Sequence, residues 1–122
     1  MIRFHPKAGT ILLCDFDTGF RPPEMVKKRP VIVVSPKAMN RILCVVVPLS
    51  TVPPVRVLEC HHRISAGRYP ALPPEKDSWV KGDMLYTVAM ERLSLIGNAS
   101  FQLSETDFAA VKQCLRHTLD ME

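Results

Sequence analysis

The chain has 122 residues, of which 47% are hydrophobic and 23% charged, with a formal net charge of +4 at pH 7. This length and composition exclude a disordered chain and predict a single domain over residues 1–122, while the positive charge is compatible with a phosphate-bearing partner. No apolar run reaches the roughly 18 residues of a membrane span, and no signal-peptide stretch opens the chain, so we expect a cytoplasmic protein without a membrane partner.

The first half of the chain predicts strands separated by one long loop. An apolar run over residues 10–16 indicates the first strand, and the loop over residues 17–28 follows, because a glycine and two adjacent prolines there exclude a regular ladder. The β-branched runs over residues 30–35 and 42–49 predict two strands that are buried on both faces. A long loop in a compact domain is often functional.

The middle of the chain gives weaker strand signals. Alternating apolar residues over 55–60 predict a short strand, and residues 78–88 resume strand character. Between them, residues 61–77 contain a glycine and three prolines and predict an irregular excursion.

The C-terminal end predicts the only helix. Ser104 is expected to cap it, with Asp107 as the capping-box partner, and Leu103 and Phe108 form a hydrophobic staple. Apolar residues at helical spacing continue from there. The predicted fold class is therefore mainly β: five or six short strands that close as a small barrel, with a C-terminal helix over one opening.

Neither the cysteines nor the histidines predict a bound cofactor. The four cysteines are scattered without a C-x-x-C pair, so we expect reduced thiols and no tetrathiolate zinc site. His61 and His62 are adjacent on an expected strand end and would point in opposite directions, which argues against a shared metal. We therefore predict no metal and no cofactor.

The segment over residues 24–36 is the most informative for chemistry. Arg29 lies where a loop enters a buried strand, and Pro30 restricts its backbone. A guanidinium held there can bind two phosphate oxygens and stabilise charge that develops on phosphorus. The alternative is a surface arginine that pairs only with Glu24.

Two further polar pairs follow buried or strand-like segments. Ser50 and Thr51 end the run over residues 42–49, where their hydroxyls can bind a phosphate or a ribose 2′-OH, or merely close a turn. Lys81 and Asp83 would lie on one face of a strand, about 7 Å apart, and could share proton transfer or form a solvated ion pair.

Taken together, these motifs resemble the MazF/PemK/Kid toxins of type II toxin–antitoxin systems. The likeness covers roughly residues 8–119, and the Arg29–Pro30 step is its most specific part. The motifs that carry it are Gly9-x-Ile11, Asp15-Phe16, Glu24, Arg29-Pro30-Val31, Val34-Ser35-Pro36 and Val47-Pro48-Leu49-Ser50-Thr51.

The resemblance implies a fold, partners and an activity. The expected fold is an SH3-like barrel of the CcdB/MazF/Kid type, working as a homodimer that a cognate antitoxin neutralises. The expected activity is metal-independent, sequence-selective endoribonuclease cleavage of single-stranded RNA, in which the ribose 2′-OH attacks the adjacent phosphate.

The resemblance also implies roles for individual residues. Arg29 is similar to the catalytic arginine of the family, and Ser50 stands where a catalytic threonine is usual, with Thr51 as a substitute. Asp83 matches a catalytic aspartate of the Kid branch, in an Arg-x-Asp pair whose arginine is here Lys81. The expected RNA-binding residues are Glu24, Lys27, Lys28 and Lys81.

Two departures from the family pattern leave alternatives open. Lysine at position 81 lacks the planar fork of arginine, and serine at position 50 lacks the methyl group of threonine. A catalytically inactive, antitoxin-binding homologue is therefore one alternative. A gyrase poison like CcdB is another, although the Trp-Gly-Ile helix end typical of that branch is replaced by Leu119-Asp120-Met121-Glu122.

Overall fold

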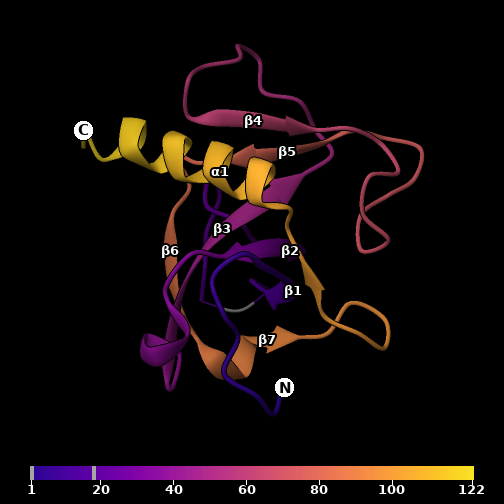
Figure 1. Cartoon of the computed structure of the whole chain (residues 1–122), viewed down its shortest axis with the longest axis vertical. Helices are drawn as coiled ribbons and strands as arrows, with labels where there is room; N and C mark the ends of the chain where they lie inside the picture. The colour runs from indigo at the N-terminus through magenta and orange to yellow at the C-terminus, as the bar shows by residue number, and fades with distance from the viewer. Residues whose placement is uncertain (1, 18) are drawn as a thin grey trace.

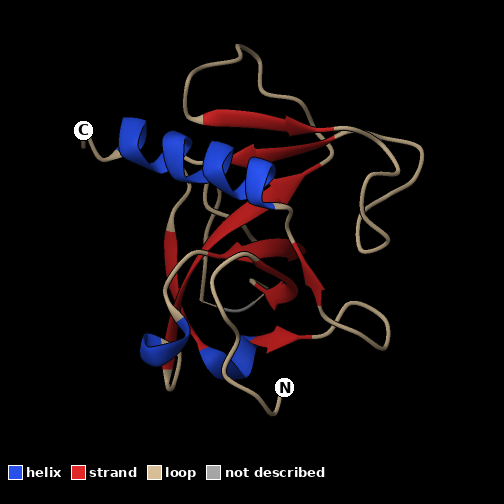
Figure 2. Ribbon diagram, in the orientation of Figure 1, coloured by secondary structure: helices blue, strands red, loops and turns tan. Residues whose placement is uncertain are grey.

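The structure, a computed structural model that describes residues 2–17 and 19–122, is an antiparallel β-sheet with one C-terminal helix (Figures 1 and 2). Within those residues eight strands form the sheet. The fold class predicted from the sequence, mainly β with a C-terminal helix, is confirmed. The elements are β1 (Thr10–Asp15), β2 (Lys28–Val33), η1 (Lys37–Met39), β3 (Leu43–Ser50), β4 (His61–Ile64), β5 (Ser78–Lys81), β6 (Tyr86–Ala89), η2 (Met90–Arg92), β7 (Leu93–Ser94), β8 (Phe101–Gln102) and α1 (Glu105–Thr118).

Strand β3 pairs with three other strands of the sheet. The strands run in the order β4-β5-β3-β2-β1-β7, while β6 also pairs with β3 and β8 with β1. The start of β3 pairs with β6, its middle with β2, and its end, at Leu49 and Ser50, with β5. One strand can pair with three neighbours because each of them bonds to a different stretch or edge of its backbone.

The core consists of two apolar clusters, to which the strands contribute alternating residues. Leu12 and Cys14 of β1 belong to one cluster, and Ile11, the residue before Leu12, belongs to the other. Helix α1 adds Val111 to the second cluster, and Figure 1 shows it lying across the sheet near β3, β4 and β5. Residues 31–33 are completely buried, as predicted for a strand covered on both faces.

The middle of the chain departs from the predicted strands. The strand expected over residues 55–60 is wrong: this segment has no regular structure, and Val55 is fully exposed. Residues 55–60 alternate in polarity but pair with no other strand among the described residues. The ladder with β5 is made by β4 instead, inside the region that was expected to be irregular. The strand predicted over 78–88 is divided into β5 and β6 by a turn at Gly82.

The helix begins as predicted, but its capping box is only half formed. The Ser104 hydroxyl accepts a hydrogen bond from the Asp107 backbone N–H (3.1 Å). The Asp107 carboxylate was expected to return to the Ser104 N–H, and this is wrong. That N–H instead donates to the Tyr69 hydroxyl (3.0 Å). A side chain from the segment between β4 and β5 therefore completes the cap.

All four cysteines are free and buried. Burial raises the pKa of the Cys14 thiol to about 12 and that of Cys114 to about 11. These thiols therefore stay protonated and act as small apolar core groups, as expected from their positions in the sequence. In the part of the chain that the structure describes, α1 and the short helices lack the length and apolarity needed to cross a membrane.

Candidate active site

Arg29 carries a partly buried guanidinium without a partner of its own. It lies near the start of β2, opposite Cys14 of β1. Its Nε atom is buried and makes no hydrogen bond, and none of the ion pairs among residues 2–17 and 19–122 involves it. An unsatisfied buried donor costs about 1–3 kcal/mol, so this group is poised for an acceptor that a ligand can bring.

The alternative pairing with Glu24 is not formed. The Glu24 carboxylate accepts a hydrogen bond from the backbone N–H of Arg21 (2.8 Å), and the Glu24 N–H donates to the Arg21 carbonyl (2.8 Å). Glu24 therefore closes its own exposed turn and leaves Arg29 free.

Arg29 shares a pocket with both hydroxyl residues predicted from the sequence. The pairing of Val31 with Pro48 places the start of β2 beside the end of β3, which brings Ser50 and Thr51 next to Arg29. The pocket has a volume of about 250 Å³. Its lining residues are Arg29, Pro30, Leu49, Ser50, Thr51, Pro73 and Ser78.

The pocket is lined by both polar and apolar side chains. Ser50 is almost buried, and its Oγ accepts a hydrogen bond from the Val52 N–H (3.1 Å), which leaves the hydroxyl proton available to a ligand. Ser50 and Arg29 offer polar groups suited to phosphate, and Leu49 and Pro73 add apolar surface to the same lining. A nucleotide requires this combination of a cationic group and an apolar surface.

Asp83 and Lys81 lie outside the pocket. Strand β5 ends at Lys81, which pairs with His61, so the regular strand expected to continue through Asp83 is wrong. Asp83 is in the following turn, and its carboxylate faces His61 Nε2 at 3.6 Å. The structure therefore brings Arg29, Ser50 and Thr51 together but leaves Lys81 and Asp83 elsewhere on the same protomer.

Neither of the two lysines that precede Arg29 lines the pocket. Lys28 lines a separate depression beside Asp15 and Arg92, because adjacent residues on a strand face opposite sides. Lys27 is exposed, and its carbonyl accepts a hydrogen bond from the Phe16 N–H (3.3 Å).

An aromatic cluster anchors the loop that leads to Arg29. Phe16 is fully buried, and its ring lies 5.2 Å from that of Phe20 and 5.1 Å from that of Tyr86. The Tyr86 hydroxyl accepts a hydrogen bond from the Met25 N–H (2.9 Å), and the Arg92 guanidinium covers Phe20 at 4.9 Å. These contacts fix the loop on both sides and hold the entrance to β2 in place.

Two of the lining residues, Ser78 and Pro73, had no predicted role. Ser78 opens β5 and was visible as a polar residue beside an apolar run, but serines are common at strand ends. Pro73 comes from the segment between β4 and β5, about twenty residues after Ser50, and no local signal places it in the pocket. Both positions depend on long-range pairing.

Cys60, His61 and Asp83 form a cluster with atoms within 4.8 Å of one another. The Leu58 N–H donates to His61 Nδ1 (3.0 Å), so the neutral ring carries its proton on Nε2, the atom that faces Asp83. A metal would need the Nε2 lone pair and would break the bond to Leu58. The arrangement therefore does not fit a metal ligand set.

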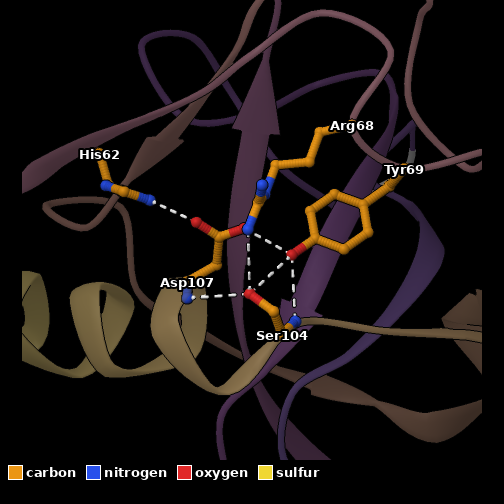
Figure 3. A network of polar contacts seen from close by, with 5 residues as sticks. All are labelled: His62, Arg68, Tyr69, Ser104 and Asp107. Atoms are coloured by element: carbon orange, nitrogen blue, oxygen red, sulfur yellow. Dashed lines mark hydrogen bonds and ion pairs between the residues drawn. The ribbon is translucent and has the colours of Figure 1, made fainter.

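A second polar network joins helix α1 to the segment between β4 and β5 (Figure 3). Asp107 is buried at its centre and accepts hydrogen bonds from Arg68 Nε (2.5 Å), the Tyr69 hydroxyl (2.5 Å) and His62 Nε2 (3.1 Å). Burial by itself raises the pKa of the Asp107 carboxyl, but these hydrogen bonds outweigh it and lower the pKa from 3.8 to about 2. The network thus holds a stable buried carboxylate.

This pKa predicts a loss of stability in acid. Because the folded-state pKa lies below the unfolded value, the carboxylate stabilises the fold by about 2 kcal/mol above pH ~4, and this contribution disappears as the pH falls towards ~2. Urea unfolding of wild type and Asp107→Asn at a series of pH values measures it. We expect the variant to be less stable near neutrality and the difference to shrink in acid. A difference that stays constant over this range would contradict the assignment.

Comparison with known proteins agrees with this architecture. The chain is 31% identical over 137 aligned residues to the uncharacterized protein YifN of Escherichia coli (strain K12), an alignment that covers 97% of this chain and 86% of YifN. The crystal structure of MazF (Form-I) from Deinococcus radiodurans superposes with a TM-score of 0.76 at 19% identity, covering 98% of this chain and 100% of that one.

A mycobacterial endoribonuclease solved in complex with its cognate antitoxin superposes with a TM-score of 0.70 at 20% identity, covering 96% and 97% of the two chains. At these identities the superpositions establish the fold. Residues 7–119 match the family described as PemK-like, MazF-like toxins of type II toxin–antitoxin systems. The chain therefore belongs to the MazF/PemK-like toxins of type II toxin–antitoxin systems.

Proposed function

We propose that this toxin is a metal-independent endoribonuclease that cleaves single-stranded RNA. The observation that carries the proposal is the unpartnered Arg29 guanidinium, which shares a pocket with the Ser50 and Thr51 hydroxyls. A phosphodiester supplies the acceptors that the buried Nε lacks. The mycobacterial and Deinococcus relatives, named as endoribonuclease and MazF, support ribonuclease action over a gyrase poison.

The reaction is an internal transfer within the RNA. The ribose 2′-hydroxyl gives up its proton to water as its oxygen bonds to the adjacent phosphorus. The bond from phosphorus to the 5′-oxygen breaks and that oxygen takes up a proton from water, so the products are a 2′,3′-cyclic phosphate and a 5′-hydroxyl. Arg29 stabilises the negative charge on the phosphorane and lies where it can donate a hydrogen bond to the leaving oxygen. Ser50 or Thr51 binds a phosphate oxygen and orients the group.

The remaining predicted residues take lesser roles in this proposal. Among the described residues, no carboxylate lines the Arg29 pocket to act as a general base. In this proposal, catalysis therefore comes from electrostatic stabilisation of the transition state and from positioning of the RNA. Asp83 receives no catalytic role because its carboxylate faces His61 outside the pocket. Lys27, Lys28 and Lys81 contribute positive charge along the approach of the RNA rather than contacts at the scissile phosphate.

We further propose that the protein works as a cytoplasmic homodimer with a cognate antitoxin as its protein partner. The relatives support this, since one was solved with its cognate antitoxin and MazE–MazF complexes are known from Deinococcus radiodurans. Exposed apolar residues provide candidate contact surface, and a run of them occupies the loop after β3. They are Val52, Val55, Val57 and Leu58.

Substitution of Ser50 tests the hydroxyl's part in the reaction. We expect Ser50→Ala to lower kcat by about 10- to 100-fold and Ser50→Thr to retain most activity, because only alanine removes the donor to the phosphate. Cleavage of a labelled single-stranded RNA at saturating concentration measures kcat, with the exposed Ser100→Ala as control. Equal rates for Ser50→Ala and wild type would exclude this role for the hydroxyl.

A further inference from the structure

The segment between β4 and β5, residues 65–77, contributes two buried residues, Ala71 and Leu72, to the core and one residue to the lining of the Arg29 pocket. It closes on itself through hydrogen bonds from the Arg68 N–H to the Ser65 carbonyl (3.2 Å) and from the Leu72 N–H to the Tyr69 carbonyl (3.1 Å). Leu72 is buried in the second apolar cluster. Pro73, the next residue, lines the pocket. We call residues 65–77 the wall segment.

Helix α1 holds the wall segment through one buried carboxylate. Both Arg68 and Tyr69 donate to Asp107 Oδ2, and the Tyr69 hydroxyl in turn accepts the Ser104 N–H, as Figure 3 shows. Because Asp107 is buried and charged, loss of any of these donors is costly. The position of the segment relative to the helix is therefore narrowly fixed.

We propose that Asp107, acting through Tyr69 and Arg68, positions the wall segment so that Pro73 forms a base-selective surface of the Arg29 pocket. The inference rests on the proposed ribonuclease function and adds a determinant of substrate choice to it. The ligand is a nucleotide of single-stranded RNA next to the scissile phosphate. Asp107 is a positioning residue, since it touches the wall segment and not the RNA.

Tyr69, which contacts Asp107, and Pro73, which lines the pocket, are joined by a short and stiff stretch of chain. Only three residues separate Tyr69 from Pro73, among them Pro70 and the buried Leu72. A proline fixes its own backbone φ and restricts the preceding residue, so few backbone torsions between Tyr69 and Pro73 are free to absorb a shift at Tyr69. The apolar surface of Pro73 offers a base or ribose a face to pack on in the same pocket as Arg29.

Three variants separate positioning from a merely structural role. Tyr69→Phe removes only the hydroxyl, and Asp107→Asn removes the negative charge to which Arg68, Tyr69 and His62 donate hydrogen bonds. Asp120→Asn is the matched control, because Asp120 is exposed beyond the end of the same helix. Hydrogen–deuterium exchange of the wall segment and steady-state cleavage of short RNAs that differ in one base beside the cut are measured for each.

We expect faster exchange of the wall-segment amides in Tyr69→Phe and Asp107→Asn. For the preferred RNA we expect KM to rise by about 3- to 10-fold with kcat within about twofold of wild type, and discrimination among the four bases to fall. The control Asp120→Asn should match wild type in every readout. A simple loss of folded protein would instead lower the apparent kcat and leave KM and base preference unchanged.

The outcomes distinguish this inference from the proposed function. If wild type cleaves RNA and Tyr69→Phe shows the same KM and base preference, the positioning role is wrong while the nuclease stands. If exchange of the wall segment is unaffected in both variants, the network does not hold it, and the inference also fails. If wild type cleaves no RNA, the proposed function fails, and the assignment of base selectivity fails with it.

Discussion

Replacing Arg29 with alanine is expected to lower the rate of RNA cleavage by about 10²- to 10³-fold, the usual cost of removing one preorganised group that stabilises transition-state charge. The guanidinium is the only cationic group among the residues that line the described pocket. No other side chain there can therefore take over the charge on the phosphorane. Single-turnover cleavage of a labelled RNA, with enzyme in excess, measures the chemical step directly.

The same variant should fold normally, which separates a catalytic effect from a structural one. Its buried Nε makes no hydrogen bond, so its removal leaves no partner unsatisfied and relieves an unpaired donor. Arg41→Ala is the matched control, since Arg41 is exposed on the connection between β2 and β3. Cleavage by a folded Arg29→Ala protein at the wild-type rate would rule out the proposed centre.

Replacing Phe16 with alanine is expected to lower the free energy of unfolding by about 3–5 kcal/mol. The ring is completely buried and packs edge-on against Phe20 and obliquely against Tyr86. Truncation leaves a cavity under the loop that leads to Arg29, so the anchor of the site weakens together with the core. Urea unfolding at fixed protein concentration measures the loss.

Phe4→Ala is the control for that experiment. Phe4 is 41% exposed, so its substitution removes much less buried apolar area than that of Phe16. A change within about 1 kcal/mol is expected there. Equal losses for the two variants would mean that the aromatic cluster around Phe16 is not the anchor described above.

The sequence predicted those elements whose signals are local and strong. Strands β1, β2 and β3 are largely apolar runs with glycine, proline or serine at one end, and α1 combines a cap with a helical stripe. Strand β4 escaped prediction because His61, His62 and Arg63 are polar, and only pairing with β5 makes them a strand. Strands β7 and β8 have two residues each, too few to leave a periodic pattern.

The candidate site was predictable where it depends on neighbouring strands and not where it depends on side-chain partners. Arg29 lies near the start of β2 and Ser50 at the end of the antiparallel β3, so their proximity follows from the hairpin. Asp83 was misplaced because its position depends on where β5 ends. Asp107 looks like an ordinary capping residue in sequence, and its partners Arg68 and Tyr69 come from a segment nearly forty positions earlier.

The central claim is that Arg29 and its neighbouring hydroxyls cleave RNA by internal attack of the 2′-hydroxyl. It is tested most directly by incubating the purified protein with single-stranded RNA in excess EDTA and identifying the ends of the fragments. We predict fragments that carry a 2′,3′-cyclic phosphate and a 5′-hydroxyl, and none from an otherwise identical RNA with a 2′-deoxyribose at the cut. Intact RNA across varied sequences, or cleavage of the 2′-deoxy substrate, would contradict the account.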